Sequence, residues 1–187
     1  VQIWKDGTAY AGEWENDKTN GDGKLWHPNG DIYSGEFIDS KAEGYGTYTC
    51  ETQGEVEGHE YEGYWKDDKK HGQGKETMEN GGVYEGDFRE GVRFGQGTYE
   101  FEDESVYTGT WVNNKMQGQG VYEFQNGKKY EGNFYKNKMN GKGKLVLPSG
   151  EIYEGDFKNN LKEGNGKFTF TNGAVYEGEF KNNKQNG

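Results

Sequence analysis

The chain repeats one pattern of aromatic residues and glycines along its whole length, and this repetition constrains its fold more than any other feature. In the clearest copy, Tyr107 is followed by Gly109, Trp111, Gly118 and Gly120, at offsets of 2, 4, 11 and 13. The copies are 23 residues apart, except that the second and third are separated by 28. They begin at Tyr10, Tyr33, Tyr61, Tyr84, Tyr107, Tyr130, Tyr153 and Tyr176, the last being incomplete. A fixed period of this length indicates a repeat array, in which each unit needs its neighbours to bury a core.

Composition alone is ambiguous, because few aliphatic residues and a net charge of -11 are typical of disordered chains. Aromatic residues make up 16% of the chain and recur in register, which favours a folded array over residues 1–187 with a five-residue insertion near 50–59. Cys50 is the single cysteine, so no internal disulfide is expected, and the sequence has neither a membrane-length apolar run nor a signal-peptide pattern. We therefore expect one continuous array in a cytoplasmic protein.

Within one copy, apolar or bare residues alternate with polar ones, as in a half-buried β-strand. Tyr107, Gly109 and Trp111 share one face, and the same alternation returns over residues 118–124. The polar residues 113–117 between them are predicted to form the turn. Because directly paired residues of an antiparallel ladder share a face, offsets 0, 2 and 4 are expected to pair with offsets 13, 15 and 17 in a hairpin.

Three-residue loops connect each hairpin to the next. Residues 28–30 (Pro-Asn-Gly) and 125–127 (Gln-Asn-Gly) fit a type I turn followed by a left-handed glycine. Pairing across the first of these loops places Leu25 beside Tyr33. The loop at residues 103–104 has glutamate where the others have glycine, so this turn is expected to differ.

The two faces of the predicted sheet differ in character. Glycines at offsets 2 and 13 leave room for rings to lie across one face. The other face is mostly acidic at offsets 1 and 3, and lysine is frequent at offset 14, which we expect to lie opposite offset 3. A solvated charge ladder is the simpler interpretation of this second face, and an acidic binding stripe is the alternative.

The frame Tyr-x-Gly-x-Trp/Phe followed by Gly-x-Gly, on a 23-residue period, resembles that of MORN (membrane occupation and recognition nexus) repeats. The resemblance covers essentially the whole chain and departs from the pattern at the insertion, at Glu76 and at Glu104. It implies an all-β fold, an elongated single-layer antiparallel meander of β-hairpins in a twisted, solenoid-like array. It also implies a non-catalytic module, because family members serve as cytoskeletal or axonemal scaffolds, membrane-junction proteins, and arms of lipid kinases or SET-domain methyltransferases.

No catalytic, metal or cofactor site is predicted. The three histidines and Cys50 are not arranged at metal-ligand or nucleophile spacing, and the Gly-x-Gly pairs lack the context of a phosphate loop. The acidic balance excludes nucleic acid as a partner and disfavours an anionic membrane. One group of lysines is the candidate for phosphate binding: Lys128, Lys129, Lys136, Lys138, Lys142 and Lys144.

The leading hypothesis is a scaffold that receives a peptide or helix of a partner protein on its aromatic face, since no second layer in this sequence covers the rings. The predicted contact residues are Tyr33, Phe37, Tyr61, Trp65, Tyr84, Phe88, Tyr107, Trp111, Tyr122, Tyr130 and Phe134. The first alternative is a phosphoinositide or membrane-surface tethering module, and the second is the arm of a larger enzyme. The incomplete copies at both ends further predict self-association through edge strands.

Overall fold

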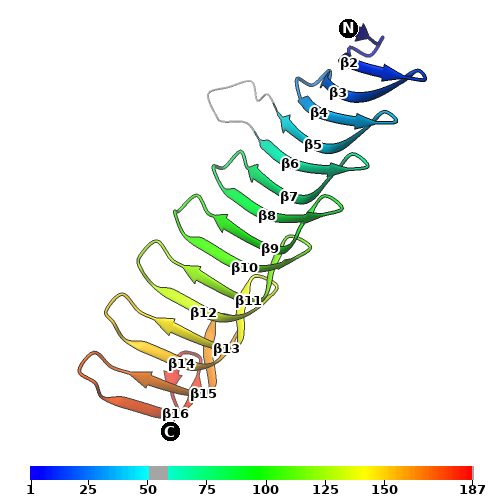
Figure 1. Cartoon of the computed structure of the whole chain (residues 1–187). Helices are drawn as coiled ribbons and strands as arrows, with labels where there is room; N and C mark the ends of the chain where they lie inside the picture. The colour runs from blue at the N-terminus through cyan, green and yellow to red at the C-terminus, as the bar shows by residue number, and fades with distance from the viewer. Residues whose placement is uncertain (51–58, 187) are drawn as a thin grey trace. The chain divides into compact units, whose positions relative to one another are not determined.

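The computed structural model describes residues 1–50 and 59–186, and every regular element in them is a β-strand (Figure 1). Each complete copy supplies a seven-residue strand that carries the tyrosine and a nine-residue strand that follows it. The strands are β1 (Gln2–Ile3), β2 (Ala9–Glu15), β3 (Lys18–Trp26), β4 (Ile32–Ile38), β5 (Lys41–Thr49), β6 (Glu60–Lys66), β7 (Lys69–Thr77), β8 (Val83–Arg89), β9 (Val92–Glu100), β10 (Val106–Val112), β11 (Lys115–Glu123), β12 (Lys129–Tyr135), β13 (Lys138–Val146), β14 (Ile152–Lys158), β15 (Leu161–Thr169), β16 (Val175–Lys181) and β17 (Lys184–Gln185).

The chain divides into two compact units, Val1–Phe94 and Gly95–Gly187, and both are built from the same hairpin. Consecutive strands within each unit pair antiparallel in chain order, so each unit is a meander in a single layer. The predicted all-β, single-layer antiparallel meander is therefore confirmed. That the copies form one continuous array over the whole chain stays a prediction.

The observed register confirms the predicted pairing across the connecting loops and the predicted faces, but inside the hairpin it differs from the prediction by two residues. In the first unit, Tyr10 lies opposite Leu25, which in turn lies opposite Tyr33 across the connecting loop. In the second unit, Tyr107 lies opposite Tyr122, and the glycines at offsets 2 and 13 lie opposite each other. The tyrosine at offset 0 pairs with offset 15 in every complete hairpin that these ladders describe, on the predicted face but two residues from the expected partner at offset 17.

The turn inside the hairpin is shorter than predicted. Asn113 and Asn114 alone form it, and both have left-handed backbones, with φ of 49° and 63°. Two such residues are the signature of a type I′ turn, which asparagine tolerates well. The expected five-residue turn over 113–117 is wrong, because β11 already begins at Lys115 and Met116 is buried.

The partners of the second aromatic residue and of the lysines also differ from the prediction. Trp111 lies opposite Met116, at offset 9, and not opposite offset 13 as expected, because the ladder shifts between Gly109 and Trp111. The lysine at offset 14 lies opposite offset 1, as Lys144 does opposite Glu131, so the predicted pairing with offset 3 is wrong. Alternation determines the face of a side chain but leaves the register free in steps of two residues.

The loops between hairpins confirm the predicted left-handed glycine, and one of them differs from what its sequence led us to expect. Gly30 and Gly127 have φ of 95° and 81°. Glu104, at the same place in its loop, adopts the same conformation with φ of 63°, so the expectation that this turn differs is wrong. The Asp103 carboxylate accepts hydrogen bonds from the backbone N–H and the hydroxyl of Ser105, and these hold the turn without glycine.

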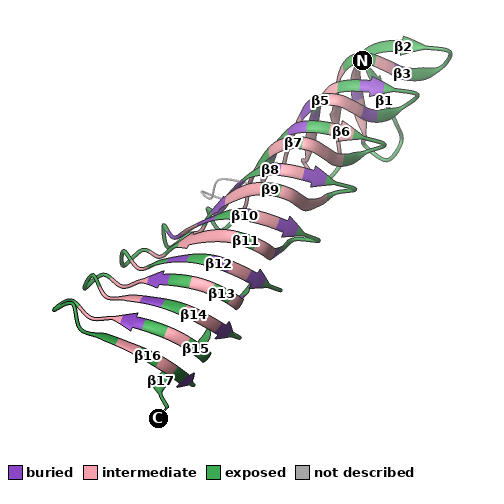
Figure 2. Cartoon of the chain, turned by 60° about the horizontal axis from the view of Figure 1, so that its bottom comes forward, coloured by how far each residue is buried: buried purple, intermediate pink, exposed green. Residues whose placement is uncertain are grey.

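One face of the sheet forms the core of each unit. Figure 2 shows the buried residues as short bands within the strands, separated by exposed and half-buried positions. A Cβ atom added at Gly120 would lie 2.5 Å from the ring of Tyr107, and one added at Gly109 would lie 2.6 Å from the Cα of Gly120. The glycines are therefore the floor on which the tyrosine rings lie. Six of these tyrosines have no exposed surface: Tyr10, Tyr61, Tyr84, Tyr107, Tyr130 and Tyr153.

Candidate functional site

We call the side of the sheet that carries the aromatic residues at offsets 0 and 4 the ring face, and the opposite side the back face. On the ring face, the tyrosine of each copy is fastened to its own strand. The Tyr33 hydroxyl donates to the Glu36 carbonyl at 3.0 Å, and the Tyr107 hydroxyl donates to the Thr110 carbonyl at 3.0 Å. Burial raises the pKa of Tyr107 to about 12, so the phenol stays protonated and remains a donor near neutral pH.

Neighbouring copies interlock through their rings. Phe37 contacts its own Tyr33 and also Tyr10 of the preceding copy, with centroid distances of 5.1 Å in both cases and nearly perpendicular planes. Phe134 in the second unit contacts Tyr130 and Tyr107 in the same way, at 5.1 and 4.9 Å. Edge-to-face pairs of this kind contribute about 0.5–1.5 kcal/mol each beyond the buried area. The ring ladder is thus the main tie between copies.

The structure places the predicted contact residues mostly inside this ladder. Trp65 and Tyr122 are half-buried, whereas nine are buried: Tyr33, Phe37, Tyr61, Tyr84, Phe88, Tyr107, Trp111, Tyr130 and Phe134. The expected uncovered row of rings is not what these positions show, because each ring is covered by rings of adjacent copies. Their contact with a partner stays a prediction.

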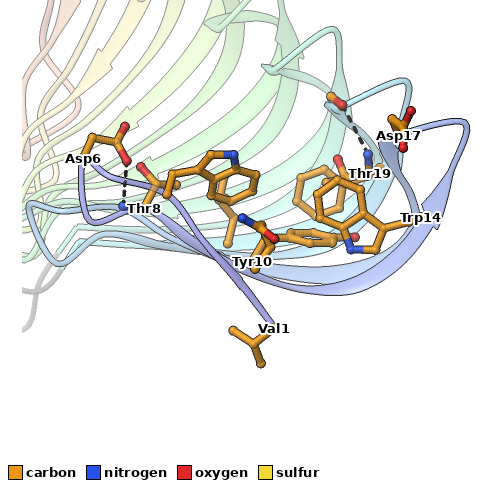
Figure 3. Close-up of a pocket in the computed structure, with 12 residues that line it drawn as sticks. Val1, Asp6, Thr8, Tyr10, Trp14, Asp17 and Thr19 are labelled. Atoms are coloured by element: carbon orange, nitrogen blue, oxygen red, sulfur yellow. Dashed lines mark hydrogen bonds between the residues drawn. The ribbon is translucent and has the colours of Figure 1, made fainter.

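The ring face is open at the first copy. A hollow of about 790 Å³ lies there, and Figure 3 shows the rings of Trp14 and Tyr10 at its side. Trp14 contacts Tyr10 at 5.3 Å and Trp4 at 6.2 Å, and it remains 46% exposed, while Trp4 is 39% exposed. Phe37, at the same offset in the next copy, contacts two tyrosines and is buried. Within the described residues, Trp14 thus contacts one tyrosine, whereas its counterpart Phe37 contacts two.

Polar groups line the edges of this hollow. The Thr19 N–H donates to the Ser40 hydroxyl at 3.2 Å, and the Thr8 N–H donates to the Asp6 carboxylate at 3.0 Å (Figure 3). The bond from Thr8 lowers the pKa of Asp6, which keeps this carboxyl ionised near neutral pH. Trp4, Trp14 and these neighbours were not predicted as site residues. The available signal was a second tryptophan, Trp4, which lies outside the repeat frame and ten residues before Trp14.

An ionic cluster replaces apolar residues on the ring face of the third copy. Glu76 makes an ion pair with Lys70 and lies 3.0 Å from the His59 ring, and the Lys70 ammonium lies 5.0 Å from the centroid of Tyr61. Burial by itself would raise the pKa of Glu76, but the hydrogen bond and charge of Lys70, with His59, hold it below its usual value. The cluster is internally satisfied and fills the space that an apolar pair fills elsewhere.

The lysines predicted to bind phosphate are not gathered into one site. Lys142 pairs with Asp156 at 2.8 Å, Lys144 with Glu154 at 3.6 Å, and Lys129 with Glu123 at 2.6 Å. Lys128 and Lys136 lie over aromatic rings. For Lys138 the structure records only its backbone pairing with Tyr135. These ion pairs reduce the positive potential that a phosphate would need.

Other chemistry is limited in the described part of the chain. Residues 1–50 and 59–186 contain no group of three or more His, Cys, Asp or Glu side chains that could hold a metal ion. Burial raises the pKa of the Cys50 thiol, which leaves it a weak nucleophile near neutral pH. The same residues include no helix long and apolar enough to cross a membrane.

Comparisons with known proteins agree with the repeat. A family model described as the MORN repeat matches residues 10–32, 33–55, 61–83, 84–106, 107–129, 130–152, 153–175 and 176–187. Alsin from Rattus norvegicus is 38% identical over 79 residues, which are 42% of this chain and 5% of alsin. MORN repeat-containing protein 3 from Xenopus laevis is 38% identical over 71 residues, which are 37% of this chain and 30% of that protein. The matches thus span less than a third of either relative.

Two solved structures show a more distant likeness. The TCP domain of Drosophila melanogaster SAS-4 (dCPAP), in complex with a proline-rich motif of Ana2 (dSTIL), aligns with 85% of this chain and 72% of its own, at 16% identity and a TM-score of 0.42. The TCP10c domain of Sas-4 from the same organism aligns with 86% of this chain and 93% of its own, at 11% identity and a TM-score of 0.46. Likeness at this level supports no inference about function.

Proposed function

Because this chain belongs to the MORN repeat family, we propose that it is a non-catalytic scaffold that binds a partner protein on its ring face, in a cytoskeletal or axonemal assembly. The observation that carries the proposal is the hollow at Trp4 and Trp14, where large rings stay 39% and 46% exposed. Half-exposed aromatic surface around a concavity is the kind of surface that partner proteins cover. An amphipathic helix, or an apolar extended segment, would fill it. The roles of other family members support the proposed assembly, and the exposed rings around the hollow support the proposed binding face.

Three of the predicted contact residues offer ring surface to a partner in this proposal, and the others support the face from within. Phe37 lines the hollow, and the half-buried Trp65 and Tyr122 offer ring edges along the face. The eight other rings are buried and hold the face in shape. A partner would therefore gain most by covering the rings near the first copy, since burial stabilises by about 25 cal/mol per Å² of apolar surface removed from water.

Substitution of Trp14 tests the proposal. We expect the full chain to capture a partner in near-equal amount from an extract of its source cells, and the Trp14→Ala variant to lose most of it. Tyr135→Ala is the matched control, because Tyr135 is 50% exposed and lies outside the hollow. Thermal unfolding of both variants shows whether the fold is kept. Equal recovery with all three chains, or recovery with none, would contradict binding at this hollow.

A second candidate function is favoured by the small share of its relatives' length that this chain matches. The segment similar to alsin makes up 5% of that protein, so repeats of this kind occur as a small part of a large chain. On this candidate the array is the arm of a larger protein, including an enzyme such as a lipid kinase or SET methyltransferase, and positions it against the same partner. The sequence of the full transcript tests it directly: further folded domains in the same reading frame support the candidate, and their absence rejects it.

A further inference from the structure

A pair of exposed tyrosines lies on the back face of the first unit. Tyr45 of β5 and Tyr64 of β6 are directly opposite each other in the ladder. Their ring centroids are 5.4 Å apart with planes at 81°, and the two residues are 46% and 52% exposed. Unlike most tyrosines of the ring face, which are fully buried, these two rings remain open to solvent.

The repeat does not require aromatic residues at these positions. Tyr45 is at offset 12 of its copy and Tyr64 is at offset 3 of the next. At the same offsets the other described copies carry only polar residues: Glu13, Asp22, Glu36, Gln73, Asp87, Gln96, Thr110, Gln119, Asn133, Lys142, Asp156, Asn165 and Glu179. Because hairpins with polar residues here fold in the same register, the rings add something to the surface that the fold does not need.

A shallow hollow adjoins the two rings. It has a volume of about 220 Å³, and its floor includes the bare backbone of Gly63 and Gly74. Glu62 and Glu85 line it, and the Tyr45 hydroxyl donates to Glu62 at 2.9 Å. This bond orients the Tyr45 ring beside the carboxylate, so an aromatic face and a negative charge lie next to each other.

The surroundings of the hollow are acidic. Residues 1–94 contain 10 Lys and Arg against 21 Asp and Glu, so the net charge of -11 of the whole chain belongs to this unit. Lys75 lies between Glu62 and Glu85 in the ladder, and Asp87 follows in the next strand. Two acidic residues therefore flank Lys75 across the ladder, and a third, Asp87, lies opposite Gln73 beside them. A nucleic acid or an anionic membrane would be repelled here, whereas a cation would be attracted.

We propose that the Tyr45–Tyr64 site binds a basic, extended peptide segment of a partner protein. An Arg or Lys side chain would lie against the exposed rings, where a cation is attracted to the face of an aromatic ring, and its charge would reach Glu62 and Glu85. The bare glycine backbone lets an extended segment approach the sheet closely. The site is on the opposite face from the hollow at Trp14, so it neither depends on that hollow nor competes with it.

Binding of a defined peptide to the full chain tests the site. The probe is a short acetylated peptide in which arginine alternates with glycine and serine, and the control peptide has glutamate in place of arginine. In spectra of the isotope-labelled chain, we expect the arginine peptide to shift the amides of Tyr45, Glu62, Tyr64 and Glu85 most strongly. The control peptide should shift none of them.

Substitutions with residues found at the same offsets in other copies show whether binding depends on the two rings or only on the acidic charge of the unit. Tyr45→Gln and Tyr64→Thr install the residues found at Gln119 and Thr110, and together they should weaken binding about three- to tenfold. Glu62→Gln with Glu85→Gln should weaken it similarly, and this second pair keeps the test valid if the first pair disturbs the fold. Tyr135→Thr, at an exposed tyrosine of the second unit, should leave binding unchanged. Shifts spread over all acidic residues, or binding that both variant pairs leave intact, would overturn the proposal.

Discussion

The two units share one hairpin but differ in charge and in what fills the variable positions of the ring face. The first unit carries the whole net charge of the chain, whereas residues 95–187 have 12 Lys and Arg against 12 Asp and Glu. At offset 9 the first unit has Thr19, Ala42, Lys70 and Arg93, and the second has Met116, Met139 and Lys162. The contact of tyrosine with glycine is nevertheless the same: a Cβ added at Gly46 or Gly120 would lie 2.5 Å from the tyrosine hydroxyl in both units. The tyrosine–glycine frame therefore specifies the hairpin, and the other positions are free to differ in charge and in binding properties.

The largest expected effect tests whether the frame is equally strict in both units. Gly109→Val in the second unit and Gly35→Val in the first should each destabilise the fold by about 3 kcal/mol, because the added methyl groups collide with backbone and with a tyrosine hydroxyl. Thr110→Val, on the back face, should change stability by less than about 0.5 kcal/mol. Denaturant unfolding measures all three. Equal losses for Gly109→Val and Thr110→Val would mean that the assignment of faces is wrong.

The next largest change in stability is expected when the ionic cluster of the first unit is replaced by the apolar residues that the second unit carries at the same offsets. Lys70→Met should cost about 2 kcal/mol, because it leaves the Glu76 carboxylate, 13% exposed, without its main partner. Adding Glu76→Tyr gives this copy the residues that stand at the same offsets in the fifth copy, Met116 and Tyr122, and should restore stability to within about 1 kcal/mol of the original chain. Chemical unfolding of the two single variants and the double variant gives the coupling. Additive losses would show that the cluster is not a unit.

The same cluster predicts a difference in acid stability. Although burial acts in the opposite direction, Lys70 and His59 lower the pKa of Glu76 below its ordinary value of 4.5. A carboxyl with a lowered folded pKa contributes stability that is present above 4.5 and is lost as pH falls through the folded value. We therefore expect the unfolding temperature of the original chain to fall more steeply below pH 4.5 than that of the Lys70→Met, Glu76→Tyr variant. Parallel curves for the two chains would argue against a stabilising Glu76 carboxylate.

A weaker effect is expected at the sheet edges, where the charge difference should decide which unit self-associates. The edge strands β1 and β17 are two residues long and exposed, and β17 pairs with β16 only at Phe180 and Lys181. The acidic first unit repels a second copy, so we expect weak, concentration-dependent dimers through the second unit. Light scattering over a tenfold range of concentration measures this. Gln185→Pro should reduce the dimer more than Ile3→Pro, and a strictly constant monomer mass would reject edge pairing.

The smallest expected effect is on membranes. Because Lys142 and Lys144 face Asp156 and Glu154, the second unit should not float with anionic liposomes at physiological salt, and Lys142→Ala with Lys144→Ala should change nothing. Flotation at low and physiological salt measures this, with recovery at background as the expected result. Binding that survives both salts and requires these lysines would favour the phosphoinositide alternative over the scaffold.

The sequence by itself determined the repeat, the strands and the two faces. Spacing of two residues between Tyr107, Gly109 and Trp111 assigns them to one face of a strand, since successive side chains of a strand alternate. The position of Gly30 in a three-residue loop predicted its left-handed backbone, because few other residues adopt it without strain. Glu104 was the exception, since it adopts the left-handed backbone without being glycine, in a loop where Asp103 accepts an additional hydrogen bond from the Ser105 hydroxyl.

Only the tertiary structure decided the register, the burial of the rings and the place where the ring face is open. Parity left the register free by two residues, and the shift that places Trp111 opposite Met116 depends on how the chain turns at Asn113. Burial depends on the neighbouring copy, because an identical offset gives a buried Phe37 and a half-exposed Trp14. A repeat pattern describes the residues of one copy, whereas the exposure of a side chain also depends on the residues of the neighbouring copies that pack against it. For the same reason, the aromatic pair of Tyr45 and Tyr64 could be recognised only when β5 and β6 were placed side by side.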